Sequence, residues 1–530
     1  MVAIPPPRWP NDPVQSSLNL HDNRLHVAEP LLETCLKRDL RDHESHSTTD
    51  GSSFASSRIV SIPSKERMMM TFKFKLLLAC TAAMTALPAS AQAQTAATNG
   101  LEIAKKMIAF RSVRGPGNQT PQLAAYLKFV LVAGGFAAND VTITPVDDTA
   151  YLIATWKGSD AALKPIVLSG HIDVVEAKPA DWQRDPFVPV VENGYLYGRG
   201  ATDMKLDAAL AIATLLDMKK AGYAPKRGIV LALSGDEETV MKTSALIADQ
   251  LKNAEMALNI DGGGGLYAEN GKAEYFTIGA AEKTYADFQL EVTNPGGHSS
   301  APRKVNAINE LSAALVKIGN YRFTPQLSPI TKGYFEGVAP RQTPEIGAAM
   351  RAFAANPKDQ KAIETLAANP GYVGQIGTTC VTTMVSGGHA FNALPQRATA
   401  NINCRIFPGV KPAAVMAELE KVAADPGVKF SDVTEGSNPT DASPLRADLT
   451  GAVKTAMGKI RPGVPVFPSM SAGASDSMWY RSVGVPSYGV SPTFTKQSDD
   501  FSHGLNERTP IDNIPLAITY YRSLLTDLTR

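Results

Sequence analysis

The stretch "IVLSGHIDVV", residues 166–175, indicates the fold class of this chain. Its first three residues form an apolar run typical of a buried strand, and His171 and Asp173 follow at the C-terminal end. In open α/β sheets, ligands bind in the crevice beyond the carboxyl ends of the strands. The position therefore predicts a binding or catalytic site, with an ordinary surface turn as the alternative for so short a motif.

Similar strand patterns occur on either side of this stretch. They cover residues 151–156, 166–170, 228–234 and 256–260, and helical patterns at 203–219 and 241–252 separate the later strands. Two further helical patterns, at 101–110 and 121–135, come before them. Alternation of strand and helix is typical of βαβ units, so we expect an α/β domain with a largely parallel sheet.

The pattern changes at residue 284. "TYADFQLEVTN" (284–294) and two later segments, 377–388 and 398–407, alternate as half-buried strands, and 306–320 forms an amphipathic helix pattern. This indicates a small α+β domain, residues 284–440, inserted between two parts of the larger domain, 94–283 and 441–530. The Pro- and Ala-rich segment 322–372 gives no clear prediction.

The N-terminal region differs from the rest. Residues 1–69 are polar and lack periodicity, which predicts a disordered or untranslated extension. From Met70 onward, Lys73 and Lys75 precede an apolar run and small-x-small sites at 89–91 and 91–93. This is the organisation of a signal peptide, residues 70–93, so we expect export to the periplasm or the medium. The run is shorter than the roughly 20 residues that span a bilayer.

Length, charge and cysteine content narrow the function. A chain of 530 residues is long for a single core, which indicates more than one domain. The formal net charge of +1 gives no electrostatic reason to expect nucleic acid as a partner. Beyond residue 93 the cysteines are Cys380 and Cys404, on two predicted strands with Asn392 midway between them. In an oxidising compartment they form either a disulfide or two buried thiols.

Acidic residues gather after the predicted strands. "GRGATDMK" places Asp203 at a helix start, "SGDEE" places Glu237 and Glu238 after strand 228–234, and "NIDGGGG" places Asp261 after strand 256–260. Each motif alone fits a solvated loop. Together, carboxylates at the ends of apolar strands repel one another, so a cation is the natural compensation. Imidazole and carboxylate ligands favour zinc or a similar divalent ion in a catalytic site.

The ordered motifs HIDVV, GRGATDMK, SGDEE, GGHSS, GGHAFNALPQRATANINCRIFPG and SHG resemble a family of dinuclear zinc peptidases and deacylases. The family includes glutamate carboxypeptidase, aminoacylase-1, acetylornithine deacetylase and carboxypeptidase S, and the resemblance spans residues 101–530. It implies a zinc-peptidase catalytic domain with a mixed, largely parallel sheet, interrupted by a ferredoxin-like α+β lid through which many members form homodimers. It also implies two zinc ions per subunit, with cobalt or manganese as substitutes.

The resemblance assigns roles to individual residues. The metal ligands would be His171 and Asp261 for one ion, Glu238 and His503 for the other, and Asp203 bridging both. The other site residues would be Asp173, which orients His171, the general base Glu237, the oxyanion donor His298, and the substrate contacts Asn392 and Arg405. His389 is either a further site residue or an ordinary residue of the lid loop.

The predicted function is an exported zinc hydrolase that cleaves a peptide or N-acyl amide bond, in a carboxypeptidase- or dipeptidase-like way on substrates with a free carboxylate. One alternative is an aminoacylase-type deacylase of N-acyl amino acids. Another is a catalytically silent binding protein, which predicts a missing base or ligand, and none is missing. The chain departs from the family pattern at Leu206, where glycine is usual, and at Asp261, where many deacylases have glutamate.

Overall fold

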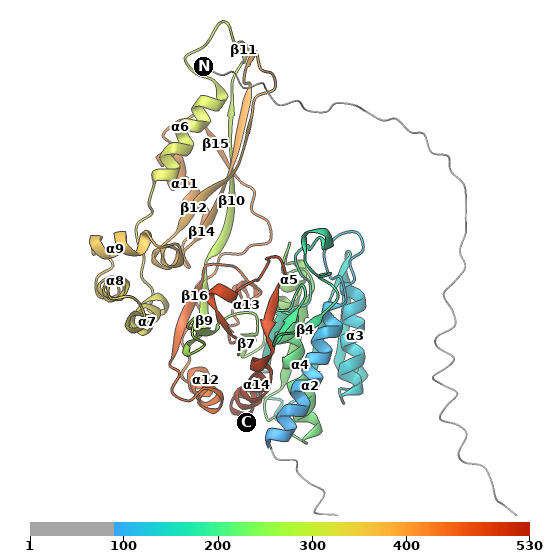
Figure 1. The fold of residues 1–530 in the computed structure, drawn as a ribbon. Helices are drawn as coiled ribbons and strands as arrows, with labels where there is room; N and C mark the ends of the chain where they lie inside the picture. Colours follow the sequence, from blue (N-terminus) through green and yellow to red (C-terminus); the bar gives the residue numbers. More distant parts are fainter. Residues whose placement is uncertain (1–88) are drawn as a thin grey trace, which may run out of the picture. The chain divides into compact units, whose positions relative to one another are not determined.

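The computed structural model describes residues 89–530 of the chain (Figure 1). The predicted extension 1–69 and most of the predicted signal peptide 70–93 lie outside the described residues. Helix α2 (Ala89–Ile108) begins inside the predicted cleavage region and is longer than the expected 101–110. Among residues 89–530, no helix is long and apolar enough to cross a membrane.

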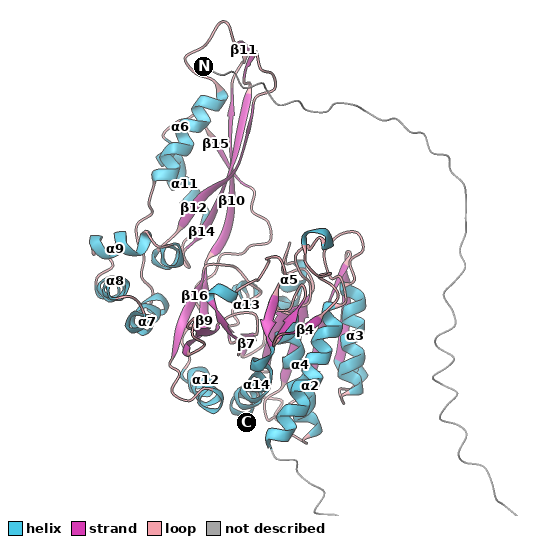
Figure 2. Ribbon diagram, viewed as in Figure 1, coloured by secondary structure: helices cyan, strands magenta, loops and turns pink. Residues whose placement is uncertain are grey.

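The larger of the two main sheets is a mixed sheet of ten strands (Figure 2). Its strands, in spatial order, are β1 (Val141–Val146), β2 (Thr149–Trp156), β6 (Ile229–Ser234), β3 (Ile166–His171), β7 (Met256–Asn259), β17 (Ser487–Gly489), β9 (Ala273–Glu282), β8 (Gly264–Tyr267) and β18 (Phe494–Lys496), and β16 (Val466–Ser471) pairs with β9. Strand β3 is parallel to both β6 and β7, so the carboxyl ends of these three strands share one edge. This confirms the predicted α/β fold class.

Helices cover both faces of this sheet. One face carries α2, α3 (Thr120–Ala133), α4 (Lys205–Lys220), α12 (Ala447–Ile460) and α14 (Ile514–Leu528), and the other carries α5 (Lys242–Gln250) and α13 (Ser477–Ser482). Successive residues of β3 enter different cores: Leu168 packs on the first face and Val167 on the second. Because β3 is buried on both faces, it begins with a continuous apolar run, residues 166–168, rather than an alternating pattern.

A second, four-stranded antiparallel sheet carries the alternating strands of the insertion. Its order is β12 (Thr379–Gly387), β14 (Arg397–Ile406), β10 (Thr284–Thr293) and β15 (Lys429–Asp432), and α6 (Ala307–Asn320) and α11 (Pro412–Ala423) pack on one face. Lys283 alone separates β9 of the first sheet from β10 of the second. The exact domain boundaries, 283/284 and 440/441, stay predictions.

The segment without a clear prediction, 322–372, is largely helical. It contains α7 (Pro329–Val338), α8 (Pro344–Ala355), α9 (Gln360–Ala367) and most of α10 (Pro370–Val373), which share an apolar core. Proline stands in the first turn of α7, α8 and α10, directly after the capping residues Ser328, Thr343 and Asn369. Proline is well tolerated at a helix start, because the first N–H groups of a helix have no intrahelical partner. The prolines here therefore mark helix starts.

The two cysteines form a disulfide. Cys380 of β12 and Cys404 of β14 are direct partners in the antiparallel register, and their Cα atoms are 4.1 Å apart. Of the two alternatives left open by the sequence, the structure has the disulfide.

Two short sheets complete the fold. In one, β19 (Arg508–Pro510) pairs with β5 (Tyr195–Tyr197), which pairs with β4 (Val190–Glu192). In the other, β11 (Gly297–His298) pairs with β13 (Ala393–Leu394). The first of these brings the chain around residue 508 beside the chain that leads to Asp203.

Candidate metal centre

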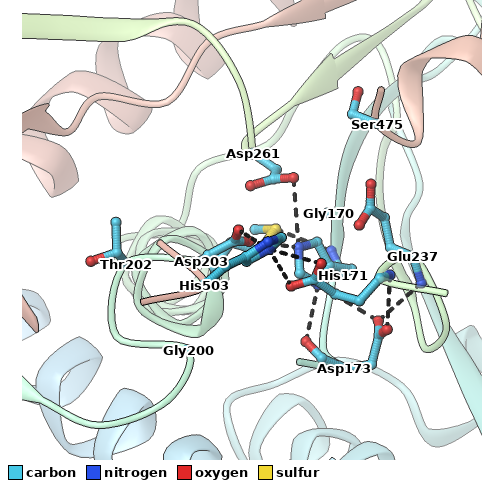
Figure 3. Close-up of polar contacts among 12 residues, drawn as sticks. Gly170, His171, Asp173, Gly200, Thr202, Asp203, Glu237, Asp261, Ser475 and His503 are labelled. Carbon is cyan, nitrogen blue, oxygen red and sulfur yellow. Dashed lines mark hydrogen bonds and ion pairs between the residues drawn. The ribbon is translucent and has the colours of Figure 1, made fainter. Parts of the chain in front are cut away.

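Four of the candidate residues stand at one edge of the large sheet. His171 is the last residue of β3, Glu237 and Glu238 follow β6, and Asp261 follows β7. Because β6, β3 and β7 are adjacent and parallel, their ends deliver these side chains to the same place (Figure 3). This convergence is what the strand-end pattern in the sequence predicted.

Asp203 and His503 reach the same place from loops. Asp203 precedes α4, and His503 lies between the 3₁₀ helix η5 (Gln497–Asp499) and β19. His171 Nε2 is 3.0 Å from Asp203 Oδ1 and 3.6 Å from Asp261 Oδ2. His503 Nε2 is 3.2 Å from Asp203 Oδ2 and 3.0 Å from Glu238 Oε2. The two oxygens of Asp203 therefore face different imidazoles.

This donor set fits metal ions. Zinc bonds of about 2.0–2.2 Å in a tetrahedron place neighbouring ligand atoms roughly 3.3 Å apart, and the separations here run from 3.0 to 3.6 Å. The donors are imidazole nitrogens and carboxylate oxygens without sulfur, which suits zinc and related divalent ions. His171, Asp203 and Glu238 in particular offer ligand atoms close enough for one ion.

The electrostatics of the cluster also favour a cation. Burial raises the pKa of Asp261 to about 7, and the charge of Asp203 adds to this. Burial alone would lower the pKa of His171, but Asp173, Asp203 and Asp261 outweigh it and raise the pKa well above its usual value. Hydrogen bonds to Asp203 and Glu238 raise the pKa of His503 to about 10. The crowded carboxylates thus hold protons on the imidazoles, and bound cations would take over that positive charge.

Asp173 acts through both its main chain and its side chain. His171 Nδ1 lies 3.0 Å from the backbone carbonyl of Asp173 but 3.6 Å from its carboxylate, too far for a hydrogen bond. The carboxylate instead accepts hydrogen bonds from the backbone N–H groups of Glu237 (3.1 Å) and Glu238 (3.0 Å). Asp173 therefore positions the "DEE" loop as well as the imidazole.

Glu237 is buried beside the candidate ligands. Burial raises its pKa well above the usual value; His171 opposes this effect, and Asp476, Asp261 and Glu238 add to it. Asp476, which the sequence reasoning missed, is buried and accepts a hydrogen bond from Ser234 Oγ at 2.8 Å. Asp476 has the same sequence pattern as the other acids, a carboxylate shortly after a strand, because "SAGASD" continues directly from strand β16.

The predicted lid residues lie elsewhere. His298 in β11 and Asn392 in the loop before β13 are exposed, as is His389, and Ser300 contacts His298 Nδ1. Arg405 in β14 is half-buried, with its guanidinium 4.9 Å from the ring centroid of Tyr285. Within residues 89–530, no hydrogen bond or ion pair links His298, Asn392 or Arg405 to the metal-ligand candidates.

Comparison with known proteins defines the family. The model of peptidase family M20/M25/M40 matches residues 167–527, which contain every candidate site residue. The chain belongs to this family. It is thus a metallopeptidase or amidohydrolase that acts on amide bonds, with a His/Asp/Glu metal site, and the predicted resemblance is confirmed.

The similar proteins have names that describe different activities. The N-fatty-acyl-amino acid synthase/hydrolase PM20D1 of Mus musculus is 30% identical over 68% of this chain and 73% of its own length. The probable carboxypeptidase S-like 2 of Dictyostelium discoideum is 28% identical over 71% of this chain and 73% of its own. Among solved structures, the M20 family metallo-carboxypeptidase Sso-CP2 of Sulfolobus solfataricus has a TM-score of 0.61 at 20% identity, covering 80% of this chain and 98% of its own. The structural likeness confirms the fold.

Proposed function

We propose that the protein is an exported dinuclear zinc hydrolase that cleaves the amide bond of substrates with a free carboxylate, in the manner of a carboxypeptidase or dipeptidase. The observation that carries this proposal is the position of Asp203, whose two carboxylate oxygens face His171 and His503. A bridging carboxylate between two imidazole-containing ligand sets suits two metal ions held close together.

The residues around the metal centre suit hydrolysis. When bound, two zinc ions would supply the Lewis acidity that activates water and polarises the scissile carbonyl. Glu237 is the base that takes the proton from the attacking water and passes it to the leaving nitrogen. Its burial beside other carboxylates raises its pKa, which helps it to hold the proton between the two steps. Asp173 fixes the backbone of Glu237 and so directs the carboxylate.

The lid residues would complete substrate binding. His298 would donate a hydrogen bond to the developing oxyanion, and Asn392 and Arg405 would bind the substrate. The guanidinium of Arg405 lies over the ring of Tyr285, and no hydrogen bond joins it to a carboxylate among residues 89–530, so its planar fork is available for a substrate carboxylate. Because His298 and Asn392 are exposed, lid closure or a second subunit would have to bring them to the metal centre.

We propose that the edge of the four-stranded sheet binds a second copy of the chain. Strand β12 is an edge strand, and it exposes Val381 (58%), Met384 (70%) and Val385 (69%). A long apolar edge invites pairing with another strand. Light scattering should show a dimer that becomes monomeric in Met384→Lys, whereas a monomeric wild-type protein would contradict this part of the proposal.

Deacylation of N-acyl amino acids is the second candidate, because PM20D1 and aminoacylase-1 are among the similar proteins. The decisive experiment is metal analysis of the purified mature chain, followed by assay of dipeptides and N-acyl amino acids in parallel. Faster cleavage of dipeptides supports the first proposal and faster cleavage of N-acyl amino acids supports the second. A metal-loaded protein that cleaves neither class would contradict both.

Export has its own test. Cleavage after residue 91 or 93 would leave Gln92 or Gln94 as the first residue and would shorten α2 without removing its buried residues from Ala96 onward. Expression in a bacterial host with fractionation, followed by N-terminal sequencing, should find one of these ends in the periplasm. An intact chain in the cytoplasm would contradict export.

A further inference from the structure

Two segments far apart in the sequence are joined directly behind the candidate metal centre. One runs from residue 198 to Asp203, and the other runs from His503 to residue 508. The backbone N–H of Gly198 donates to the carbonyl of Glu507 at 3.0 Å, and Thr202 Oγ1 donates to the carbonyl of Arg508 at 2.9 Å. The first segment ends at Asp203 and the second begins at His503. These two candidate metal ligands lie within ion-pair distance of each other (Figure 3).

Glu507 is the centre of this junction. Its side chain is fully buried, and both carboxylate oxygens have two donors. Oε2 accepts from Arg199 Nη1 at 2.7 Å and from the N–H of Gly200 at 3.0 Å. Oε1 accepts from the N–H groups of Thr202 at 2.7 Å and Asp203 at 3.0 Å. The carboxylate therefore holds the backbone of Asp203 directly.

Arg199 extends the same network to the other ligand. Its Nη2 donates to the backbone carbonyls of His503 at 3.4 Å and Gly504 at 3.2 Å, and its guanidinium lies 5.0 Å from the ring centroid of Trp182. His503 itself has a φ of 60°, a left-handed conformation that is uncommon for a residue other than glycine. Neighbouring contacts must hold such a conformation in place, and Arg199 supplies one of them.

We propose that Glu507, through Arg199, is a positioning residue that sets the separation of Asp203 and His503 and thereby controls binding of the metal ion between them. The inference rests on the proposed dinuclear site. Asp203 and His503 come from separate loops, so their side chains meet only if these loops keep a fixed relation. Partners that orient metal ligands typically change metal affinity by about 10–100-fold when they are removed.

Glu507→Gln tests this role with little change in size. The amide keeps one oxygen but turns an NH₂ group towards two of the four donors, so at least one side of the junction opens. The matched control is Glu282→Gln, which disturbs another deeply buried pair, Glu282 and Arg481, 2.9 Å apart. His503→Ala is the positive comparator, because it removes a ligand candidate outright.

The measurement is zinc retention by the full mature chain during titration with a chelator, alongside the melting temperature of the metal-free protein. Glu507→Gln should lose one of two ions at chelator concentrations about 10–100-fold lower than wild type does. Excess zinc should restore kcat with KM unchanged in Glu507→Gln but not in His503→Ala. Glu282→Gln should lower the melting temperature and keep both ions.

The outcomes separate the inference from the proposed function. If Glu507→Gln melts at a lower temperature but retains both ions as wild type does, Glu507 is only structural and the inference is wrong. If wild type binds fewer than two ions, the dinuclear function fails and the inference fails with it, which the wild-type measurement alone reveals. If Glu507→Gln does not fold, Arg199→Lys takes its place, because lysine keeps the charge but cannot bridge Glu507 and the carbonyl of His503.

Discussion

The two sheets present their candidate site residues in opposite ways. The ten-stranded sheet brings His171, Glu238 and Asp261 to one edge. There His171 lies within ion-pair distance of Asp203 and Asp261, and Glu238 lies within ion-pair distance of His503. The four-stranded sheet leaves His298 and Asn392 exposed beyond its strands. The difference indicates that the fold alone assembles the candidate metal site, whereas the proposed substrate contacts need a further event to reach it.

Parallel and antiparallel strands explain this difference. Neighbouring parallel strands end at the same edge, so residues distant in sequence meet there without special loops. Antiparallel strands alternate in direction, so neighbouring strands do not end at one shared edge, and Asn392 lies exposed in a connecting loop. The disulfide between Cys380 and Cys404 stiffens the strands of the lid but not the loop that carries Asn392.

The largest expected effect comes from Glu237→Gln in the preassembled half. The substitution removes the proposed proton acceptor and leaves every candidate ligand in place, so turnover should fall by about 10³–10⁴-fold while metal content is unchanged. Steady-state assays and metal analysis of the same sample test this. Near-normal activity in a fully metal-loaded variant would show that another group is the base.

Lys283, which joins the two sheets, predicts a pH effect on stability. Burial, followed by the charge of Arg405, lowers its pKa from 10.5 to about 7, and its Nζ donates to Gly377 O and Thr379 Oγ1. Between these values the unfolded chain binds the proton that the folded chain lacks, so stability rises with pH and is lowest below pH 7. From pH 7 to pH 10.5 the gain approaches about 5 kcal/mol, at ~1.4 kcal/mol per pKa unit.

Lys283→Met removes this dependence. Urea unfolding of both proteins from pH 6.5 to 9.5 should show wild type gaining stability relative to the variant as pH rises. Glu282 adjoins Lys283 but pairs with Arg481, so the control Glu282→Gln should follow the wild-type slope. Parallel curves for wild type and Lys283→Met would contradict the assignment.

A smaller effect is expected from the disulfide of the second sheet. Replacing both cysteines by serine should lower the unfolding free energy by about 3 kcal/mol, because the bond closes a loop of moderate length. The metal content of the large sheet should not change. Thiol titration of the denatured, unreduced mature protein should find no free thiol from Cys380 and Cys404, and two free thiols would contradict the bridge.

The smallest expected effect is that of Arg405→Ala, which tests whether Arg405 binds a substrate carboxylate. Losing a charge-assisted pair should cost about 2 kcal/mol for a substrate with a free carboxylate and little for its amide. Arg405→Lys should rescue only in part, because lysine cannot bind in a bidentate way. The ratio of kcat/KM for the two substrates is the measurement, and an equal loss on both would make Arg405 structural.

The amino-acid sequence was enough to predict the α/β class, and it also predicted an insertion after residue 283 and the residues of a candidate metal cluster. It could do so because strand-end acids and histidines have a local signature, an apolar run followed at once by a polar side chain. The alternation of "TYADFQLEVTN" likewise predicted β10, which forms with its inward face buried. These features depend on nearest neighbours along the chain.

Contacts between distant residues could be seen only in the folded chain. The helices of 322–372 stayed unpredicted because their prolines resemble loop signals until the caps before them are seen. Glu507 looks like an ordinary surface acid in "GLNERTP", since its four donors come from a loop about 300 positions earlier. Asp173 likewise turned out to hold Glu237 and Glu238 through its carboxylate. Hydrogen bonds across such separations leave no periodicity in the sequence, because pairing is set by the packing of the whole fold.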